Sequence, residues 1–239
     1  PNCPQIAPPT GFVITPENMQ LQRSEHDDAE YRRNYVAAEY MNALFGLNNS
    51  WDGGGVKVGV MDDGVLPTGE LEGKVDMELS RDFGFEKLDE NGKPVYRTGD
   101  DRIGNSKSDH GTPVAAIIAA RNDGNGVQGI APGATIVSLR VDGNINDADF
   151  NGFGSEDAVR YAADNNIPLI NMSLARSEPN APVNRQFRDA MIYYNQKIGG
   201  LLINSAGNNS EANPRNMGDM DPSNAESWLY VVAIEPNVD

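Results

Sequence analysis

The sequence predicts an α/β fold, a doubly wound and mostly parallel sheet with helices on both faces. Two observations predict it. Short apolar runs recur along the chain, and amphipathic stretches of helical length separate them. The runs are rich in Val, Ile and Leu, which is typical of strands buried on both faces. Strands and helices that alternate at this spacing favour a parallel sheet with crossover helices.

The expected elements follow from these patterns in chain order. The expected strands cover residues 56–61, 135–141, 167–173, 200–206 and 229–234. The expected helices between them cover residues 110–120, 155–165 and 184–198. Ser155 precedes two acidic residues, which favours a helix start, and Gly199 is a suitable stop for the third helix.

Two stretches fall outside this alternation. Residues 1–26 contain five prolines and no sustained period, so we expect an extended N-terminal arm, followed by a helix over residues 28–46. Residues 81–108 contain charged and turn residues, with an Asn-Gly pair between short β-like runs. This pattern predicts a surface hairpin insertion. We expect residues 27–239 to form one domain that includes this insertion.

The charge balance is strongly acidic. Lys and Arg number 19 against 35 Asp and Glu, which gives 19 − 35 = −16. Such a surface repels phosphate groups and no basic stripe compensates, so we expect no nucleic-acid partner and no contact with an anionic membrane. No apolar run approaches the roughly 20 residues that would span a bilayer. The first residue is Pro1, so we expect a processed or trimmed product.

Polar residues that could carry chemistry follow two of the expected strands. The carboxyl ends of parallel strands meet at one edge of a sheet, where functional groups gather. Asp62 and Asp63 follow the first strand, and they could form a solvated acidic turn or a magnesium site. Asn208 follows the fourth strand, where it could belong to an ordinary turn or donate its amide to a developing oxyanion.

His110 is the one credible imidazole base. The chain has 2 His, and the other, His26, lies in a polar stretch. His110 opens an apolar helix in the segment DHGTPVAAIIAA. The Gly-Thr pair after it would let the backbone turn tightly and the ring face outward, in the position of a general base.

Five sequence blocks occur in one order over about residues 50–235: VKVGVMDDGV, DHGTPVAA, GVQGIAPGATIVSLRV, PLINMSLA and NSAGNN. Together they resemble the signature blocks of the subtilisin-like serine proteases, the subtilase family. The resemblance implies an endopeptidase that cleaves peptide or protein substrates with an Asp-His-Ser triad. It makes Asp62 the triad acid, because the pattern places the acid two residues before the glycine. It makes His110 the general base and Asn208 the oxyanion-hole donor.

The resemblance also implies a substrate site. Family members bind substrates beside two extended segments, which match Gly152-Phe153-Gly154 and Ser173-Leu174-Ala175 here and would pair with a peptide as an added strand. Ser205, Ala206 and Gly207 would form a pocket wall. The family usually has glycine at the position of Ala175, and the extra methyl would narrow the pocket for the residue before the cut bond. No cofactor is required, and a structural calcium ion is compatible with the resemblance, without identified ligands.

The serine block of the family, of the Gly-Thr-Ser-Met-Ala type, is absent from the sequence. In the family it follows the oxyanion asparagine and opens a helix through the core. We therefore expect an incomplete subtilisin-like domain, inactive alone, that receives its serine from a complementary C-terminal fragment or a second chain. Two hypotheses remain beside this one. The first is a pseudoprotease that binds extended peptides, and the second is a metal-dependent hydrolase or binding protein that uses the two aspartates.

The N-terminal helix carries a further resemblance. The segment AEYRRNYVAAEYMNALFGL, followed by GGGVKVGVMDDGV, is similar to the start of the passenger domains of bacterial autotransporter subtilases. This similarity implies export from a Gram-negative cell and a secreted or cell-surface location.

Overall fold

The computed structural model describes residues 52–92, 94–96, 110–123, 126–141, 153–174, 185–208 and 227–231. Its main element is a six-stranded sheet in the order β2-β5-β1-β6-β7-β8. These strands are β1 (Lys57–Asp62), β2 (Arg81–Asp82), β5 (Thr135–Arg140), β6 (Leu169–Met172), β7 (Leu201–Ser205) and β8 (Trp228–Val231). Every neighbouring pair is parallel, so the carboxyl ends of all six strands lie at one edge.

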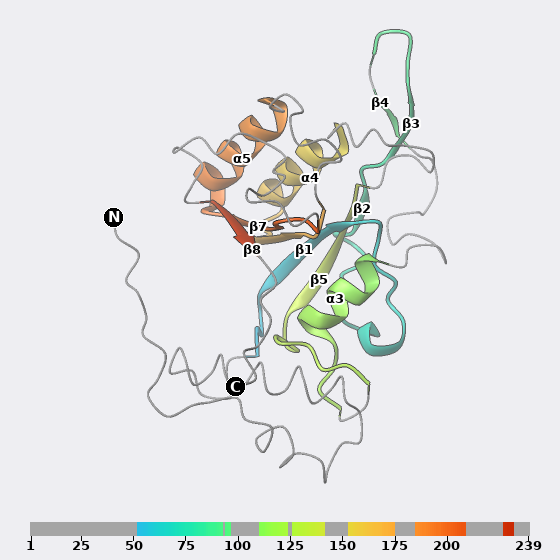
Figure 1. Ribbon diagram of the computed structural model, residues 1–239, viewed down its shortest axis with the longest axis vertical. Coiled ribbons are helices and arrows are strands. Elements are labelled where there is room, and N and C mark those ends of the chain that lie inside the picture. Colours follow the sequence, from blue (N-terminus) through green and yellow to red (C-terminus); the bar gives the residue numbers. More distant parts are fainter. Residues whose placement is uncertain are drawn as a thin grey trace.

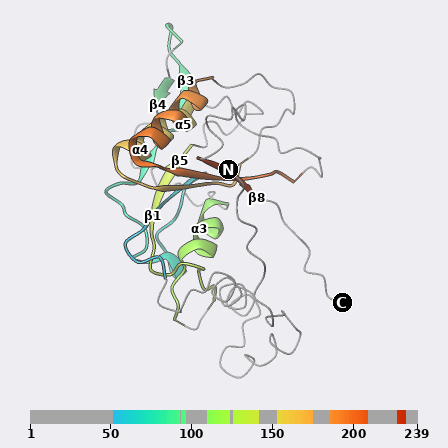
Figure 2. The same ribbon diagram turned by 90° about the vertical axis from the view of Figure 1, so that its left-hand side faces the viewer.

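Helices cover both faces of this sheet. The helix α3 (Gly111–Ala119) packs against one face at β1 and β5, whereas α4 (Phe153–Asp164) and α5 (Arg185–Ile198) lie together on the opposite face (Figure 1 and Figure 2). The expected fold class is therefore confirmed.

Each face of the sheet has its own hydrophobic cluster, because successive side chains of a strand point to opposite faces. Val58 and Val60 of β1 pack with buried alanines of α3. Met61, next along the strand, packs with α4 and α5. Gly59 also faces α4 and α5, and a Cβ there would lie 2.7 Å from Cδ1 of Leu139. The first strand thus reaches its carboxyl end with both faces buried.

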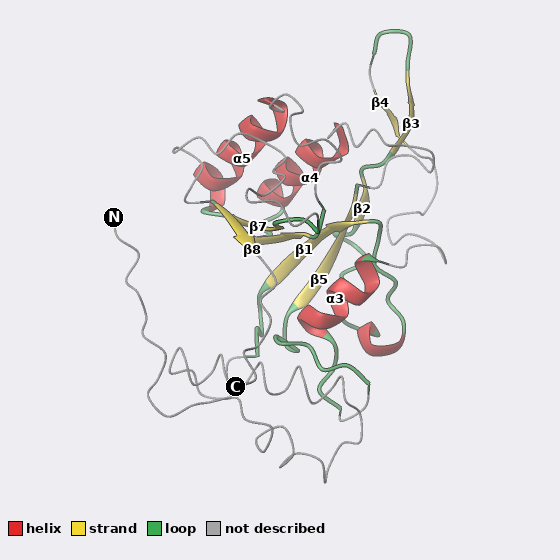
Figure 3. Ribbon diagram, viewed as in Figure 1, coloured by secondary structure: helices red, strands yellow, loops and turns green. Residues whose placement is uncertain are grey.

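Smaller elements lie outside the six-stranded sheet. The strands β3 (Phe85–Leu88) and β4 (Pro94–Tyr96) form a separate antiparallel pair within the stretch expected to be an insertion. Figure 3 shows this pair projecting away from the main sheet. A short 3-10 helix, η1 (Gly69–Leu71), follows β1. Arg81 and Asp82, the first two residues of that stretch, belong to the main sheet as β2.

Some sequence expectations differ from the structure or lie outside it. The helix α4 begins at Phe153, two residues before Ser155, and the Ser155 hydroxyl is buried without a hydrogen-bond partner in the described part of the chain. Ser155 therefore does not cap the helix. The expected N-terminal arm and the helix over residues 28–46 lie outside the described residues.

Candidate active site

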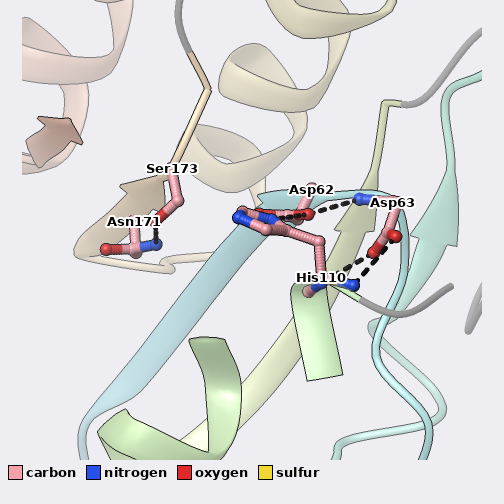
Figure 4. A network of polar contacts seen from close by, with 6 residues as sticks. Asp62, Asp63, His110, Asn171 and Ser173 are labelled. Atoms are coloured by element: carbon pink, nitrogen blue, oxygen red, sulfur yellow. Dashed lines mark hydrogen bonds and ion pairs between the residues drawn. The ribbon is translucent and has the colours of Figure 1, made fainter. Parts of the chain in front are cut away.

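The end of β1 and the start of α3 meet at one pair of side chains. Asp62 is the last residue of β1, and its side chain is 1% exposed. His110 directly precedes α3, and its Nδ1 lies 2.8 Å from Oδ1 and 3.0 Å from Oδ2 of Asp62 (Figure 4). The imidazole is 54% exposed. The structure therefore joins a buried carboxylate to a solvent-exposed imidazole.

Burial controls the electrostatics of this pair. Desolvation raises the pKa of the Asp62 carboxyl above its usual value, since it disfavours the charged form. The hydrogen bond from His110 and the Asp63 N–H, which donates to Oδ1 of Asp62 at 2.8 Å, oppose this rise in pKa. When the Asp62 carboxylate accepts a hydrogen bond from Nδ1–H, the neutral ring keeps its lone pair on Nε2. That nitrogen is then the basic atom of the ring.

Asp63 contacts the helix start instead of the ring. Its Oδ2 accepts the His110 N–H at 3.2 Å and its Oδ1 accepts the Gly111 N–H at 2.7 Å (Figure 4). His110 occupies the N-cap position of α3 but makes no side-chain capping bond. Asp63 supplies the cap from another element, which leaves the imidazole available to Asp62. Thr112 adds a second connection, because its Oγ1 accepts the Leu66 N–H at 3.0 Å.

Close packing explains the glycine after the histidine. Gly111 is the first residue of α3 and does not have a positive φ, so the expected tight turn is not its role. A Cβ at this position would lie 2.3 Å from the Gly64 carbonyl oxygen and 3.0 Å from Cβ of Asp62. The helix start can therefore approach the end of β1 only with glycine at this position.

The neighbouring strands bring further predicted residues to the same edge. Val60 of β1 is paired with Asn171 of β6, which places Ser173 and Leu174 beside the Asp62 region. Nδ2 of Asn171 donates to Oγ of Ser173 at 3.0 Å (Figure 4).

Asn208 lies just beyond β7, two strands away from β1, and is an exposed residue. The residues that lead from β7 to Asn208 are also at this edge. Ser205 ends β7, the Ala206 N–H donates to the Val231 carbonyl at 2.9 Å, and Gly207 has a φ of +89°. Asn208 therefore shares the edge with Asp62 and His110.

The remaining predicted substrate residues have a different placement. Gly152 and Ala175 lie outside the described residues. Phe153 and Gly154 form the first turn of α4, so the expectation that they are extended is wrong. Gly154 is buried there, and a Cβ on it would lie 2.5 Å from the Phe83 carbonyl oxygen. A glycine is therefore needed at position 154 because the start of α4 lies directly against the chain that follows β2.

The described ranges contain neither a metal cluster nor a membrane-spanning helix. There, no group of three or more His, Cys, Asp or Glu side chains could hold a metal ion. The oxygens of Asp62 and Asp63 instead accept hydrogen bonds from the protein, which disfavours the metal-dependent hypothesis. None of the helices in this part of the chain combines the length and the apolar character needed to cross a membrane.

The parallel sheet, its two helical layers and a buried aspartate bonded to a histidine agree with the subtilisin-like class of hydrolase. Comparison of the sequence with known families identifies the family. Residues 53–238 match the profile of the subtilase family, Peptidase_S8. The chain belongs to this family.

Individual relatives agree with the family assignment. The thermostable alkaline protease of Halalkalibacterium halodurans is 26% identical over 202 residues, which cover 83% of this chain and 46% of that protein. An extracellular serine protease of Serratia marcescens is 31% identical over 140 residues, which cover 57% of this chain and 11% of that protein. The solved MycP3 protease from the type VII (ESX-3) secretion system shares the fold, with a TM-score of 0.54 at 24% identity over 77% of this chain and 54% of that chain. The chain thus spans about half the length of the first and third of these relatives.

Proposed function

We propose that this chain is the aspartate- and histidine-bearing part of a serine endopeptidase. The observation that carries the proposal is the 2.8 Å hydrogen bond between His110 Nδ1 and the buried carboxylate of Asp62. Asp62 fixes the ring tautomer, so that Nε2 of His110 accepts the proton of a serine hydroxyl as that oxygen attacks a peptide carbonyl. The same carboxylate stabilises the imidazolium, which then gives its proton to the leaving amine.

Asn208 is the proposed donor to the oxyanion. This exposed residue follows β7 at the edge of the sheet that carries Asp62. An amide aimed at the tetrahedral intermediate stabilises the charge that develops on its oxygen, and removal of such a donor typically lowers kcat by about 10²–10³.

The proposed substrate is an extended peptide. Ser173 and Leu174 follow β6 beside the Asp62 region, where a peptide could add as a strand. Ser205, Ala206 and Gly207 are the proposed pocket wall, and Ala175 is proposed to narrow that pocket. Gly152, Phe153 and Gly154 are the proposed second side of the groove, with Phe153 and Gly154 in the first turn of α4.

The nucleophilic serine is proposed to come from a complementary C-terminal segment or a second chain. An uncovered part of the sheet supports this proposal. Trp228 and Tyr230 of β8 pack toward α5, so Leu229 and Val231 point to the face that carries α3. These two side chains are 50% and 49% exposed, and Ile117 of α3 is 52% exposed. An additional apolar segment beside α3 would bury them.

Turnover of peptides by the full-length gene product tests the proposed function. The unaltered protein is expected to hydrolyse a peptide substrate, and His110→Ala and Asp62→Asn are each expected to lower kcat by about 10³–10⁴. Peptide binding without turnover would instead indicate the pseudoprotease. Activity that is lost with a chelator and survives in Asp62→Asn would indicate the metal-dependent alternative.

The proposed location is outside the cell or on its surface, in a bacterium. The extracellular relative from Serratia marcescens supports this location. Origin as an autotransporter passenger is the more specific form of the proposal, and fractionation of the producing cells tests both. The chemistry takes its acid, base and nucleophile from side chains and needs no cofactor. A structural calcium ion remains a separate proposal, tested by the effect of a chelator on the melting temperature.

A further inference from the structure

Asn204 is a polar side chain in an otherwise apolar layer. It is the fourth residue of β7 and is 0% exposed, on the same face as Leu202, which belongs to the core under α4 and α5. Its Nδ2 donates to the Met172 carbonyl at 2.8 Å and to the Leu174 carbonyl at 2.8 Å. Both hydrogens of the Asn204 amide therefore form hydrogen bonds with the backbone at and just after the end of β6.

These two bonds define the path of that chain. β6 ends at Met172, so the bond to Leu174 extends the connection with β7 beyond the last residue of the strand. Because the carbonyls at 172 and 174 point toward one amide, the intervening carbonyl of Ser173 points the other way, as in extended backbone. On the opposite face of the sheet from Met172, the Asn171 side chain donates to the Ser173 hydroxyl at 3.0 Å. The segment 172–174 is thus fixed from both faces.

The amide of Asn204 is expected to destabilise the core. Its Oδ1 is buried and has no hydrogen-bond partner among the described residues. A buried acceptor without a partner destabilises a fold, and an apolar side chain of similar volume would avoid this cost. The benefit of Asn204 must therefore come from what its Nδ2 holds in place.

We propose that Asn204 is a positioning residue that presets segment 172–174 as the edge to which an extended peptide substrate pairs. This inference rests on the proposed function, because Ser173 and Leu174 contact substrate only in that account. Asn204 itself does not touch the substrate. It turns the Ser173 carbonyl toward the peptide by holding the carbonyls on either side of it, so that the edge needs no ordering when the peptide binds.

The test measures peptide affinity in the full-length gene product with His110→Ala as background, so that no substrate is cleaved. The probe is a fluorescein-labelled tetrapeptide, followed by fluorescence anisotropy. Asn204→Ala removes both bonds, and Asn204→Asp keeps the shape but has no N–H donor. Each is expected to weaken binding by about tenfold, the equivalent of one net hydrogen bond. Leu202→Ala is the matched control, since it opens a cavity in the same strand without touching segment 172–174.

The outcomes separate the inference from the proposed function. Weaker peptide binding in both Asn204 variants, with Leu202→Ala close to the background affinity, supports the inference. Equal losses in all three variants, or no loss in the Asn204 variants, overturn it and leave the proposed function standing. Absence of peptide binding in the background protein overturns both. Thermal melting of each variant shows that the compared proteins are folded.

Discussion

Replacement of Asp63 by alanine is the sharpest perturbation of the site that leaves the Asp62–His110 pair chemically intact. The Asp63 carboxylate accepts the His110 N–H at 3.2 Å and the Gly111 N–H at 2.7 Å. Loss of an N-cap costs about 0.5–2 kcal/mol of stability, and a net hydrogen bond to a charged group is worth about 1.5–3 kcal/mol. Because the first bond is long, we expect a loss of about 2 kcal/mol in the free energy of unfolding.

The same change is expected to slow turnover. The backbone at the start of α3 would no longer be bound to the end of β1 through Asp63, whereas the Thr112–Leu66 bond and the Asp62–His110 side-chain bond would remain. A displacement of the ring by about 1 Å can cost about 10² in rate. We therefore expect the turnover rate to fall by one to two orders of magnitude, with little change in KM.

The assay is steady-state peptide hydrolysis by the full-length protein at a temperature where each variant is folded. Asp63→Asn is the control, since its amide oxygen retains one acceptor and it should lie between the alanine variant and the unaltered protein. A folded Asp63→Ala protein with an unchanged turnover rate would refute the positioning role. Complete loss of activity in Asp63→Asn, together with dependence on a divalent metal, would favour the metal-dependent hypothesis instead.

Three further predictions follow from other contacts. Burial raises the pKa of the Glu156 carboxyl to about 7, so ionisation of this group lowers the stability of the fold as pH rises from about 4.5 to 7. Glu156→Gln should therefore raise the free energy of unfolding by at most about 3 kcal/mol at pH 8 and by little at pH 4. An equal gain at both pH values in urea titrations would contradict this expectation. Gly111→Ala should lower both stability, by about 1–3 kcal/mol, and the turnover rate, because its Cβ would lie 2.3 Å from the Gly64 carbonyl oxygen; a variant with native melting temperature and rate would count against the close packing. Leu229→Asn should weaken association with the serine-bearing segment by roughly tenfold, measured by titration of the separate segment, and unchanged affinity would place that segment elsewhere.

The central strands could be predicted because burial on both faces leaves a continuous apolar run. The runs that became β1, β5, β6 and β7 deviate from the structure by only one or two residues at their ends. The strand β2 could not be predicted in this way. It consists of Arg81 and Asp82, and these charged residues join the sheet through pairing with β5, where Arg140 lies 3.5 Å from the Asp82 carboxylate.

Some residues of the candidate site could also be predicted from the sequence, and others could not. Asp62 and His110 are 48 residues apart, and the family resemblance, rather than any periodicity, predicted that they would meet. The capping role of Asp63 and the role of Asn204 were not predicted from the sequence. Both side chains bind backbone atoms of distant segments. Because almost every residue has a backbone N–H and a carbonyl, the sequence does not indicate which residue such a side chain will bind. The extended conformation expected of Phe153 and Gly154 failed because α4 begins earlier than its serine suggested.

Asp62 and His110 are proposed to activate a serine that lies outside residues 1–239. The most direct test of this proposal is labelling of the full-length protein with a fluorophosphonate probe, followed by mass-spectrometric mapping of the modified residue. We expect one labelled serine outside residues 1–239 and the loss of labelling in His110→Ala. A folded protein that does not react, or a probe attached to a serine within residues 1–239, would contradict it.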